Sequence, residues 1–196
     1  MGLRMAFRLL LLLFIALPAF GSDVAEVKIE EKDRLSNIEL TLNGAGLRKR
    51  AFFQVYAIGL YLPEKTASAA DAIAAPGPKR VAMHMLRDVG ADQFGGALTD
   101  GMKDNLGEAE MKAMQPRIQQ LLAAMNEMKE AKKGMRITLD WVPAAGTQLT
   151  VDGKPTGAPI AGDDFYRALL KIWLGERPVQ DDLKKALLGE MSGPKS

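Results

Sequence analysis

The sequence contains no cysteine and a single histidine, His84, among its 196 residues. Without cysteine the chain can form no disulfide, carry no lipid on a cysteine and offer no thiolate to a zinc ion. One histidine is too few for a multi-histidine metal site, and no Asp-x-Asp-x-Asp-Gly calcium loop is present. We therefore expect no metal and no cofactor, and we expect His84 to be structural or exposed.

An excess of charge of one sign is also missing. The chain has 26 basic and 24 acidic side chains, a formal net charge of +2, and Arg4 and Arg8 near the N-terminus account for that excess. Proteins that bind nucleic acids carry a clear basic excess or a basic stripe. The composition therefore predicts no nucleic-acid partner.

The N-terminus has the three parts of a secretory signal peptide in order. Arg4 and Arg8 are followed by an unbroken apolar run at 9–17 and then by Pro18. Ala19 and Gly21 supply small residues at the two positions that a signal peptidase reads. As a helix, residues 9–20 span about 18 Å, whereas the hydrocarbon core of a bilayer is about 30 Å thick. The alternative is an uncleaved N-terminal anchor.

Residues 1–21 are accordingly predicted to be a cleaved signal peptide, and residues 22–196 a single domain of ordinary length. The mature protein is expected to be periplasmic or secreted, with no stable transmembrane segment after cleavage.

Apolar residues alternate with polar ones in several segments, a pattern typical of strands with one buried face. We expect such strands at 27–29, 38–42, 80–86, 135–142 and 148–151. The long apolar, aromatic-rich run at 51–62 is interpreted as a central strand. Elsewhere apolar residues recur every three or four positions, which indicates amphipathic helices. Helices are expected at 66–75, 91–128, 163–174 and 180–188. This order predicts an α+β domain with helices on one face of a large antiparallel sheet.

Turn-forming residues suggest where the elements end. The glycine-rich segment 43–46 is interpreted as a turn, and Asp152-Gly153 as a tight hairpin turn. Pro116 suits the first turn of a helix and not its interior, so the helical region is expected to break near Gln115.

Two segments resemble the chalcone isomerase family, in particular its bacterial, exported, chalcone isomerase-like branch. The first is LNGAGLRKR at 42–50, followed by FQVYAIGLYL at 53–62, and the second is GDDFYRALLKIWLG at 162–175. The resemblance implies the family's open-faced β-sandwich, with a ligand cleft between the sheet and the helices.

The resemblance covers only part of the catalytic set of the plant enzymes. Arg48 matches their arginine, whereas Tyr56 falls on a threonine position, Phe94 on a tyrosine, Gly101 near an asparagine and Ile172 on a residue with a hydroxyl group. Phenylalanine, glycine and isoleucine side chains donate no hydrogen bond to a phenolate. Chalcone cyclisation is therefore not expected.

Arg48 and Tyr56 remain as candidate ligand-binding residues. Fatty-acid-binding members of the family use such a pair on the ligand carboxylate, so the resemblance implies a small-molecule amphiphile such as a fatty acid as the partner. The chemistry agrees, because a guanidinium facing an apolar cavity needs an anionic partner and matches a carboxylate in a bidentate geometry.

Three alternatives stay open at this point. In the first, Arg48 pairs with a protein carboxylate such as Asp88 or Glu39. In the second, the protein is an intramolecular lyase or isomerase of chalcone isomerase type, with Arg48 stabilising an oxyanion and Tyr56 acting as acid or base. In the third, the protein is an interaction module whose cleft is filled by its own side chains.

Overall fold

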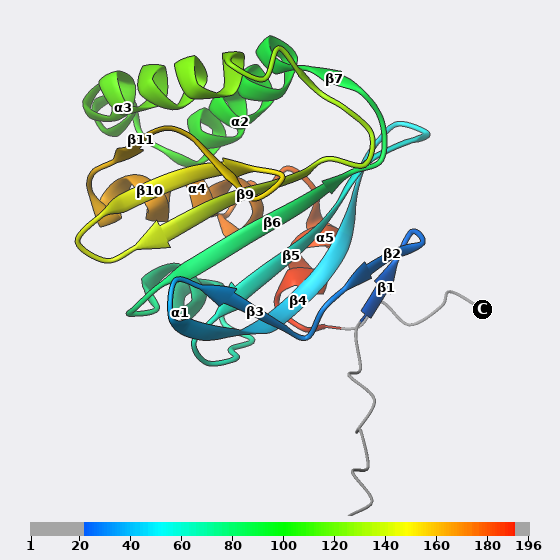
Figure 1. Ribbon diagram of the computed structural model, residues 1–196. Helices are drawn as coiled ribbons and strands as arrows, with labels where there is room; N and C mark the ends of the chain where they lie inside the picture. The colour runs from blue at the N-terminus through cyan, green and yellow to red at the C-terminus, as the bar shows by residue number, and fades with distance from the viewer. Residues whose placement is uncertain (1–21, 191–196) are drawn as a thin grey trace, which may run out of the picture.

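A seven-stranded sheet forms the centre of the fold in the computed structural model, which describes residues 22–190 (Figure 1). Its strands are β3 (Lys32–Leu35), β4 (Ile38–Arg50), β5 (Phe53–Leu62), β6 (Lys79–Met85), β9 (Arg136–Val142), β10 (Gly146–Val151) and β11 (Lys154–Ile160). They are ordered β11-β10-β9-β6-β5-β4-β3, and every neighbouring pair is antiparallel. The predicted α+β class with an antiparallel sheet is confirmed. The predicted signal peptide, residues 1–21, lies outside the described residues.

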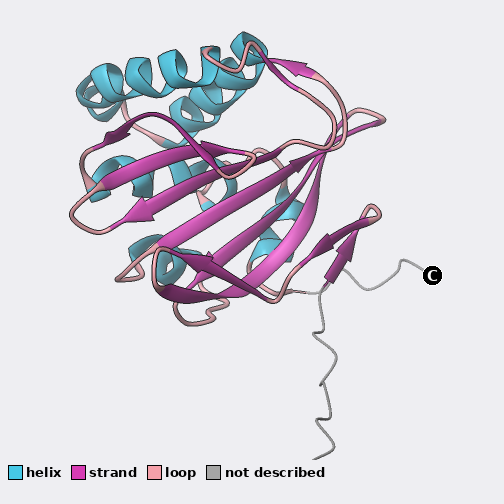
Figure 2. Cartoon of the chain, viewed as in Figure 1, coloured by secondary structure: helices cyan, strands magenta, loops and turns pink. Residues whose placement is uncertain are grey.

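The main helices gather on one side of this sheet, as Figure 2 shows. They are α1 (Ala69–Ala74), α2 (Ala91–Asn105), α3 (Glu108–Asn126), α4 (Asp163–Leu174) and α5 (Asp181–Leu187). Two short antiparallel pairs complete the described chain: β1 (Ser22–Val24) with β2 (Val27–Ile29), and β7 (Val89–Gly90) with β8 (Glu130–Ala131). The arrangement leaves the opposite face of the sheet without helices.

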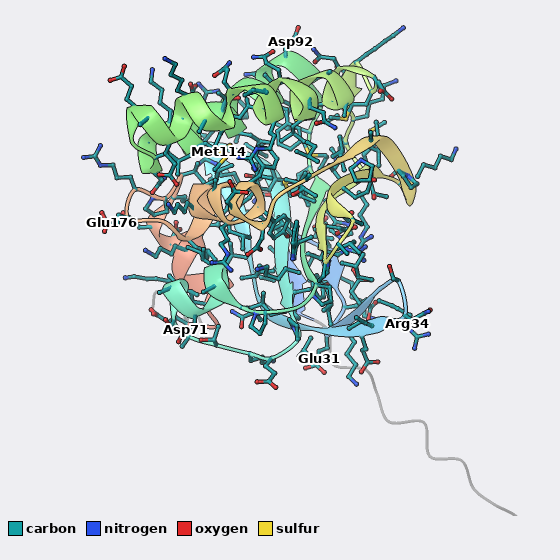
Figure 3. The ribbon with its side chains drawn as sticks, turned by 90° about the vertical axis from the view of Figure 1, so that its left-hand side faces the viewer. Glu31, Arg34, Asp71, Asp92, Met114 and Glu176 are labelled. Carbon is teal, nitrogen blue, oxygen red and sulfur yellow. The ribbon has the colours of Figure 1, made fainter. Side chains whose placement is uncertain are left out.

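The larger apolar core lies between the sheet and the helices. Alternate residues of β5, such as Ile58 and Leu60, point to this side and are buried among side chains from α2, α3 and α4. Met114 of α3 lies between α3 and α4 in the side view of Figure 3 and is also buried. The intervening residues of β5, Ala57 and Tyr61, belong to a second, smaller cluster on the opposite face. The period-2 alternation of the strands thus supplies both clusters.

The face without helices carries a buried ionic network. Arg80 of β6 binds Asp140 of β9 through two hydrogen bonds of 2.7 and 2.8 Å, and its Nη1 lies 2.9 Å from Asp33 Oδ1. Asp33 also pairs with Arg136. Because Asp33 belongs to β3, the sheet must curl strongly for this edge strand to reach β6 and β9. The network therefore fixes the curvature of the sheet.

The predicted turn at 43–46 is wrong, because β4 continues from Ile38 to Arg50, with an irregularity in its pairing with β5 between Leu42 and Gly44. The glycines serve helix packing instead. A Cβ atom on Gly44 would lie 2.1 Å from the backbone oxygen of Ala186, and one on Gly46 would lie 2.6 Å from Leu183. The small residues let α5 approach the backbone of β4.

The predicted helix break near Gln115 is also misplaced. The chain turns at Leu106 and Gly107, both extended, and α3 then continues through Pro116. Pro116 has no N–H to donate to the carbonyl of Lys112, four residues earlier. Both residues are exposed, so water can donate a hydrogen bond to that carbonyl instead. By contrast, the predicted Asp152-Gly153 turn is confirmed, with both residues in the left-handed region between β10 and β11.

Candidate functional site

The two candidate residues are brought together across one strand pair. Arg48 of β4 is the direct register partner of Tyr56 of β5, so their side chains leave the sheet on the same side. Tyr56 belongs to the core between the sheet and the helices. The pair therefore faces the helix layer.

Tyr56 is buried and held by aromatic neighbours from two helices. Its hydroxyl accepts a hydrogen bond of 3.1 Å from Nε1 of Trp173 in α4, and its ring centroid lies 6.2 Å from that of Phe94 in α2. Burial raises the pKa of Tyr56, although the Trp173 hydrogen bond and the nearby Arg48 charge oppose the rise. The phenol is thus protonated at neutral pH. Its own hydrogen has no acceptor among the described residues.

Arg48 is half-buried and contacts neutral oxygens. Its Nη1 donates to the Lys49 carbonyl at 2.5 Å and to Gln180 Oε1 at 3.3 Å. Among the described side chains, no carboxylate lies within ion-pair distance of it. The two carboxylates considered as alternatives are engaged elsewhere: Glu39 pairs with Lys32, and Asp88 accepts a hydrogen bond from the Lys133 amide.

Gln180 positions Arg48 and was not predicted from the sequence. Its side-chain amide donates to the Leu47 carbonyl at 3.0 Å and accepts from the Lys49 amide at 2.8 Å, so it pairs with the β4 backbone as a neighbouring strand would. No local motif indicates this role, because it depends on the place where α5 meets the strand. Trp173 carried a usable signal, since a buried indole N–H needs an acceptor.

The positions at which the plant enzymes carry polar groups form an apolar layer here. Phe94 packs against Tyr56. On the same helix, a Cβ atom at Gly101 would lie 2.8 Å from Cγ2 of Ile172 in α4. The structure therefore brings these positions together in space, and they offer no proton donor or base.

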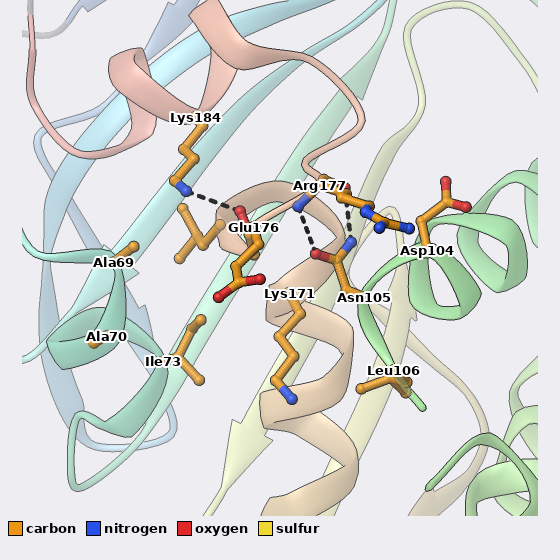
Figure 4. Close-up of a pocket in the computed structure, with 12 residues that line it drawn as sticks. Ala69, Ala70, Ile73, Asp104, Asn105, Leu106, Lys171, Glu176, Arg177 and Lys184 are labelled. Carbon is orange, nitrogen blue, oxygen red and sulfur yellow. Dashed lines mark hydrogen bonds between the residues drawn. The ribbon is translucent and has the colours of Figure 1, made fainter. Parts of the chain in front are cut away.

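Two pockets of the described surface lie near the helix layer and β4. The larger, of about 650 Å³, lies between α1 and the C-terminal ends of α2 and α4 (Figure 4). Asn105 closes one side through hydrogen bonds to the backbone of Arg177, and Lys184 on another side donates to the Gly175 carbonyl. Lys171, also in the wall, lies 3.4 Å from Glu110. Three of the pocket's polar side chains, those of Asn105, Lys171 and Lys184, are thus engaged within the protein.

The second pocket, of about 590 Å³, follows the outer side of β4 between α5 and the β1–β2 hairpin. Neither pocket is lined by Arg48 or Tyr56. Beside Tyr56, the Phe94 ring and the Trp173 indole occupy the interior. A ligand tail at the candidate pair therefore requires side chains of the helix layer to move.

Two further properties concern the described residues 22–190. They contain no group of three or more histidine, aspartate or glutamate side chains placed to hold a metal ion. Within the same residues, every helix is too short or too polar to cross a bilayer.

Comparison with known proteins identifies relatives at the level of family and fold. A family described as chalcone isomerase-like matches residues 21–189. Among solved structures, a fatty-acid binding protein of Arabidopsis thaliana is similar with a TM-score of 0.65 and 16% sequence identity, over 83% of this chain and 92% of that chain. No curated protein matches the sequence significantly. The identity is low, so this structural likeness establishes the fold.

Proposed function

Because the chain belongs to the chalcone isomerase-like family and its half-buried Arg48 has only neutral partners, we propose that the protein binds a fatty acid or a similar anionic amphiphile without transforming it. The observation that carries the proposal is the environment of Arg48. A partly desolvated guanidinium is most stable beside an anion, and the described side chains supply none. A ligand carboxylate would complete the site.

The head group would be held by two residues, Arg48 and Tyr56, that donate hydrogen bonds. The planar guanidinium of Arg48 matches the two oxygens of a carboxylate. Tyr56 would add a third hydrogen bond, since its hydroxyl already accepts from Trp173 and its own hydrogen remains available. Trp173 thus orients the phenol toward the ligand.

The tail would enter the apolar layer below α2. Met85, the register partner of Tyr56 in β6, and Met102 of α2 belong to the same core cluster as Phe94. Methionine side chains have three rotatable bonds and adapt to irregular ligands. Each buried methylene of the tail contributes about 0.8 kcal/mol, which offsets the rearrangement of these side chains.

An isomerase is the less favoured alternative. General-base catalysis by Tyr56 requires the phenolate, whereas burial raises the pKa of this tyrosine. Phe94, Gly101 and Ile172 contribute no other proton-transfer group. A binding role uses the protonated phenol as it stands.

The N-terminal sequence and the structural neighbour support the same proposal. If residues 1–21 direct export, the domain works in an extracytoplasmic compartment where membrane-derived acyl chains are available. The Arabidopsis protein of similar fold is described as a fatty-acid binding protein. The protein would then be an exported amphiphile carrier, periplasmic or secreted.

The test is a titration of the delipidated chain from Ser22 with a fluorescent fatty acid and, in parallel, with its methyl ester. We expect the acid to bind and the ester to bind about 10- to 100-fold more weakly, as removal of a charged hydrogen-bond partner predicts. Arg48→Gln should weaken binding of the acid by a similar factor and leave the ester unaffected. Tyr56→Phe should produce a smaller loss.

Arg177→Gln is the matched control, because Arg177 lines the larger pocket, which neither Arg48 nor Tyr56 lines. This variant should bind the acid as the unmodified chain does. If Arg177→Gln abolishes binding and Arg48→Gln does not, the ligand lies in the wrong place for this proposal. If neither acid nor ester binds, the proposal is wrong.

A further inference from the structure

The tip of the β4–β5 hairpin exposes two adjacent phenylalanines. Phe52 is 100% exposed and Phe53 is 59% exposed. Ile38 is also an exposed large hydrophobic residue, but it begins β4 at the far end of the strand. Figure 1 shows the hairpin turn projecting beyond the body of the sheet.

The turn holds Phe52 outward. Arg50 pairs with Phe53, so the turn consists of Ala51 and Phe52 alone. Ala51 has φ of 53°, in the left-handed region that favours glycine. A turn that served only to connect two strands would ordinarily take glycine here and a polar residue at 52. This turn instead presents an aromatic ring to solvent on a short, constrained connection.

Basic side chains lie at the same end of the sheet as the two rings. Arg87 lies in the chain between β6 and β7, and its guanidinium lies over the Phe53 ring, 4.5 Å from the ring centroid. A second loop joins this end of the sheet, because the Gly134 amide donates to the Met85 carbonyl at 2.8 Å. We call this surface the basic-aromatic tip and define it by exposed side chains on three segments: Lys49, Arg50, Phe52, Phe53, Arg87, Lys132 and Lys133.

The charge of the tip is one-sided. Its three segments, 49–54, 86–88 and 132–134, carry five basic residues and one acidic residue, Asp88. The Asp88 carboxylate is already engaged by the Lys133 amide. This local excess contrasts with the near-neutral balance of the whole chain. It is complementary to a surface that carries many negative charges.

We propose that the basic-aromatic tip docks the protein on an anionic phospholipid bilayer. Aromatic and aliphatic side chains enter the boundary between head groups and acyl chains, while neighbouring cations contact the phosphates. A projecting ring with cations around it fits a deformable surface of this kind. The tip docks independently of ligand binding, because none of its side chains belongs to the Arg48–Tyr56 pair.

Docking in this way would also orient the molecule. Arg48 lies near the same end of β4, two residues before Arg50. The candidate ligand site would thus face the membrane, from which free amphiphiles exchange.

The first test is co-sedimentation of the chain from Ser22 with vesicles of phosphatidylcholine alone and of equal parts phosphatidylcholine and phosphatidylglycerol. This chain contains every described strand and helix, and circular dichroism checks the fold of each variant. We expect binding to the mixed vesicles that weakens as salt is added. Phe52→Ser should weaken it about tenfold, since the ring loses its burial in the interface. The control Ile38→Ser should change nothing.

The second test uses the charges and a local probe. The double variant Lys132→Gln, Lys133→Gln removes two positive charges and should weaken binding to the mixed vesicles about fivefold for each charge removed. A Phe52→Trp variant should show a blue shift of its emission, relative to the unmodified chain, when mixed vesicles are added.

Several outcomes would overturn the proposal. They are equal binding of Phe52→Ser and the unmodified chain, equal binding to both vesicle types, and no vesicle binding at all. Self-association that Phe52→Ser abolishes, without vesicle binding, would instead identify the tip as a contact between copies. Fatty-acid titration of Phe52→Ser keeps the two proposals separate, because this variant should retain full affinity for the free acid.

Discussion

Two arginines on opposite faces of the same sheet have very different surroundings. Arg80, on the face without helices, is buried and bonded to Asp140 in a bidentate geometry, with Asp33 as a second anion. Arg48, on the helix face, is half-buried and meets a carbonyl and an amide oxygen. The first charge is neutralised within the protein, whereas the second is not.

The two arginines differ in whether the protein itself supplies an anion for their charge. Burial lowers the pKa of Arg80, yet the hydrogen bonds and charges of Asp140 and Asp33 outweigh it and raise that pKa overall. Such a group has a structural role, since loss of Asp140 leaves the buried guanidinium with Asp33 as its remaining anion and without its bidentate partner. Arg48 has no anion to lose. We therefore expect Arg80 to matter for stability and Arg48 for ligand binding.

The largest expected effect breaks the Arg80 pair. Asp140→Asn should lower the free energy of unfolding by about 3 to 5 kcal/mol, because it leaves the buried guanidinium without its bidentate partner. Arg48→Gln should change it by less than about 1 kcal/mol, since only hydrogen bonds to neutral groups are lost. Urea unfolding followed by circular dichroism measures both.

A double variant serves as the control for that prediction. Arg80→Met with Asp140→Leu removes both charges at once and should recover much of the lost stability, as replacement of buried ion pairs by apolar residues often does. Equal losses for Asp140→Asn and Arg48→Gln would show that the two arginines do not differ in role.

The next effect tests the packing that sets the surroundings of Arg48. Gly44→Ala should lower the free energy of unfolding by about 1 to 3 kcal/mol, because its Cβ would lie 2.1 Å from the Ala186 oxygen and push α5 away. Gly96→Ala is the matched control: its Cβ meets nothing within 4 Å in α2, so alanine should raise stability by about 0.5 to 1 kcal/mol. Thermal unfolding compares them. A neutral Gly44→Ala would mean that α5 is not seated as described.

A smaller effect concerns the helix face at alkaline pH. Burial raises the pKa of Tyr56 above its ordinary value of 10.0. The folded state therefore holds this proton more tightly than the unfolded chain, so the stability contribution is complete below pH 10 and is lost as the pH rises beyond it. Tyr56→Phe should flatten the alkaline fall in the free energy of unfolding. Tyr61 and Tyr166 also have raised pKa values and will keep part of that fall.

The smallest effect concerns the opposite face at acid pH. Burial, aided by the charge of Arg136, lowers the pKa of His84 below its ordinary value of 6.5. The unfolded chain then binds this proton more readily, so stability should fall as the pH drops below 6.5. His84→Gln should reduce that slope in urea unfolding at successive pH values. An unchanged slope would show that other groups cause the acid sensitivity.

Local sequence patterns predicted most of the fold. A long apolar, aromatic-rich run identified the core strand around 53–62, alternation identified the strand around 80–86, and helical spacing identified α4. The short strand β3 and the strand β11 were missed. Three of the four residues of β3 are charged, and Asp33 among them forms an ion pair with Arg80 across the curled sheet. β11 contains Pro155 and Gly157, residue types that are uncommon within strands. Such strands are defined by their neighbours and not by their own alternation.

The site was only partly accessible from the sequence. Arg48 and Tyr56 could be named as candidates because a family resemblance marks them, and the structure makes them register partners across β4 and β5. Gln180 could not, because its role arises from α5 meeting the edge of β4. The turn at 43–46 was wrongly predicted for the same reason. A glycine that allows a helix to pack closely on a strand cannot be told from a turn glycine by sequence alone.

The central claim is that Arg48 is kept free of protein anions for a ligand carboxylate. A crystal structure of the chain from Ser22 with a bound fatty acid tests it most directly. We predict the carboxylate oxygens within hydrogen-bond distance of the Arg48 guanidinium and the Tyr56 hydroxyl, with the tail among the side chains below α2. A carboxylate bound to Lys171 or Arg177 in the larger pocket, with Arg48 still on Gln180, would contradict it.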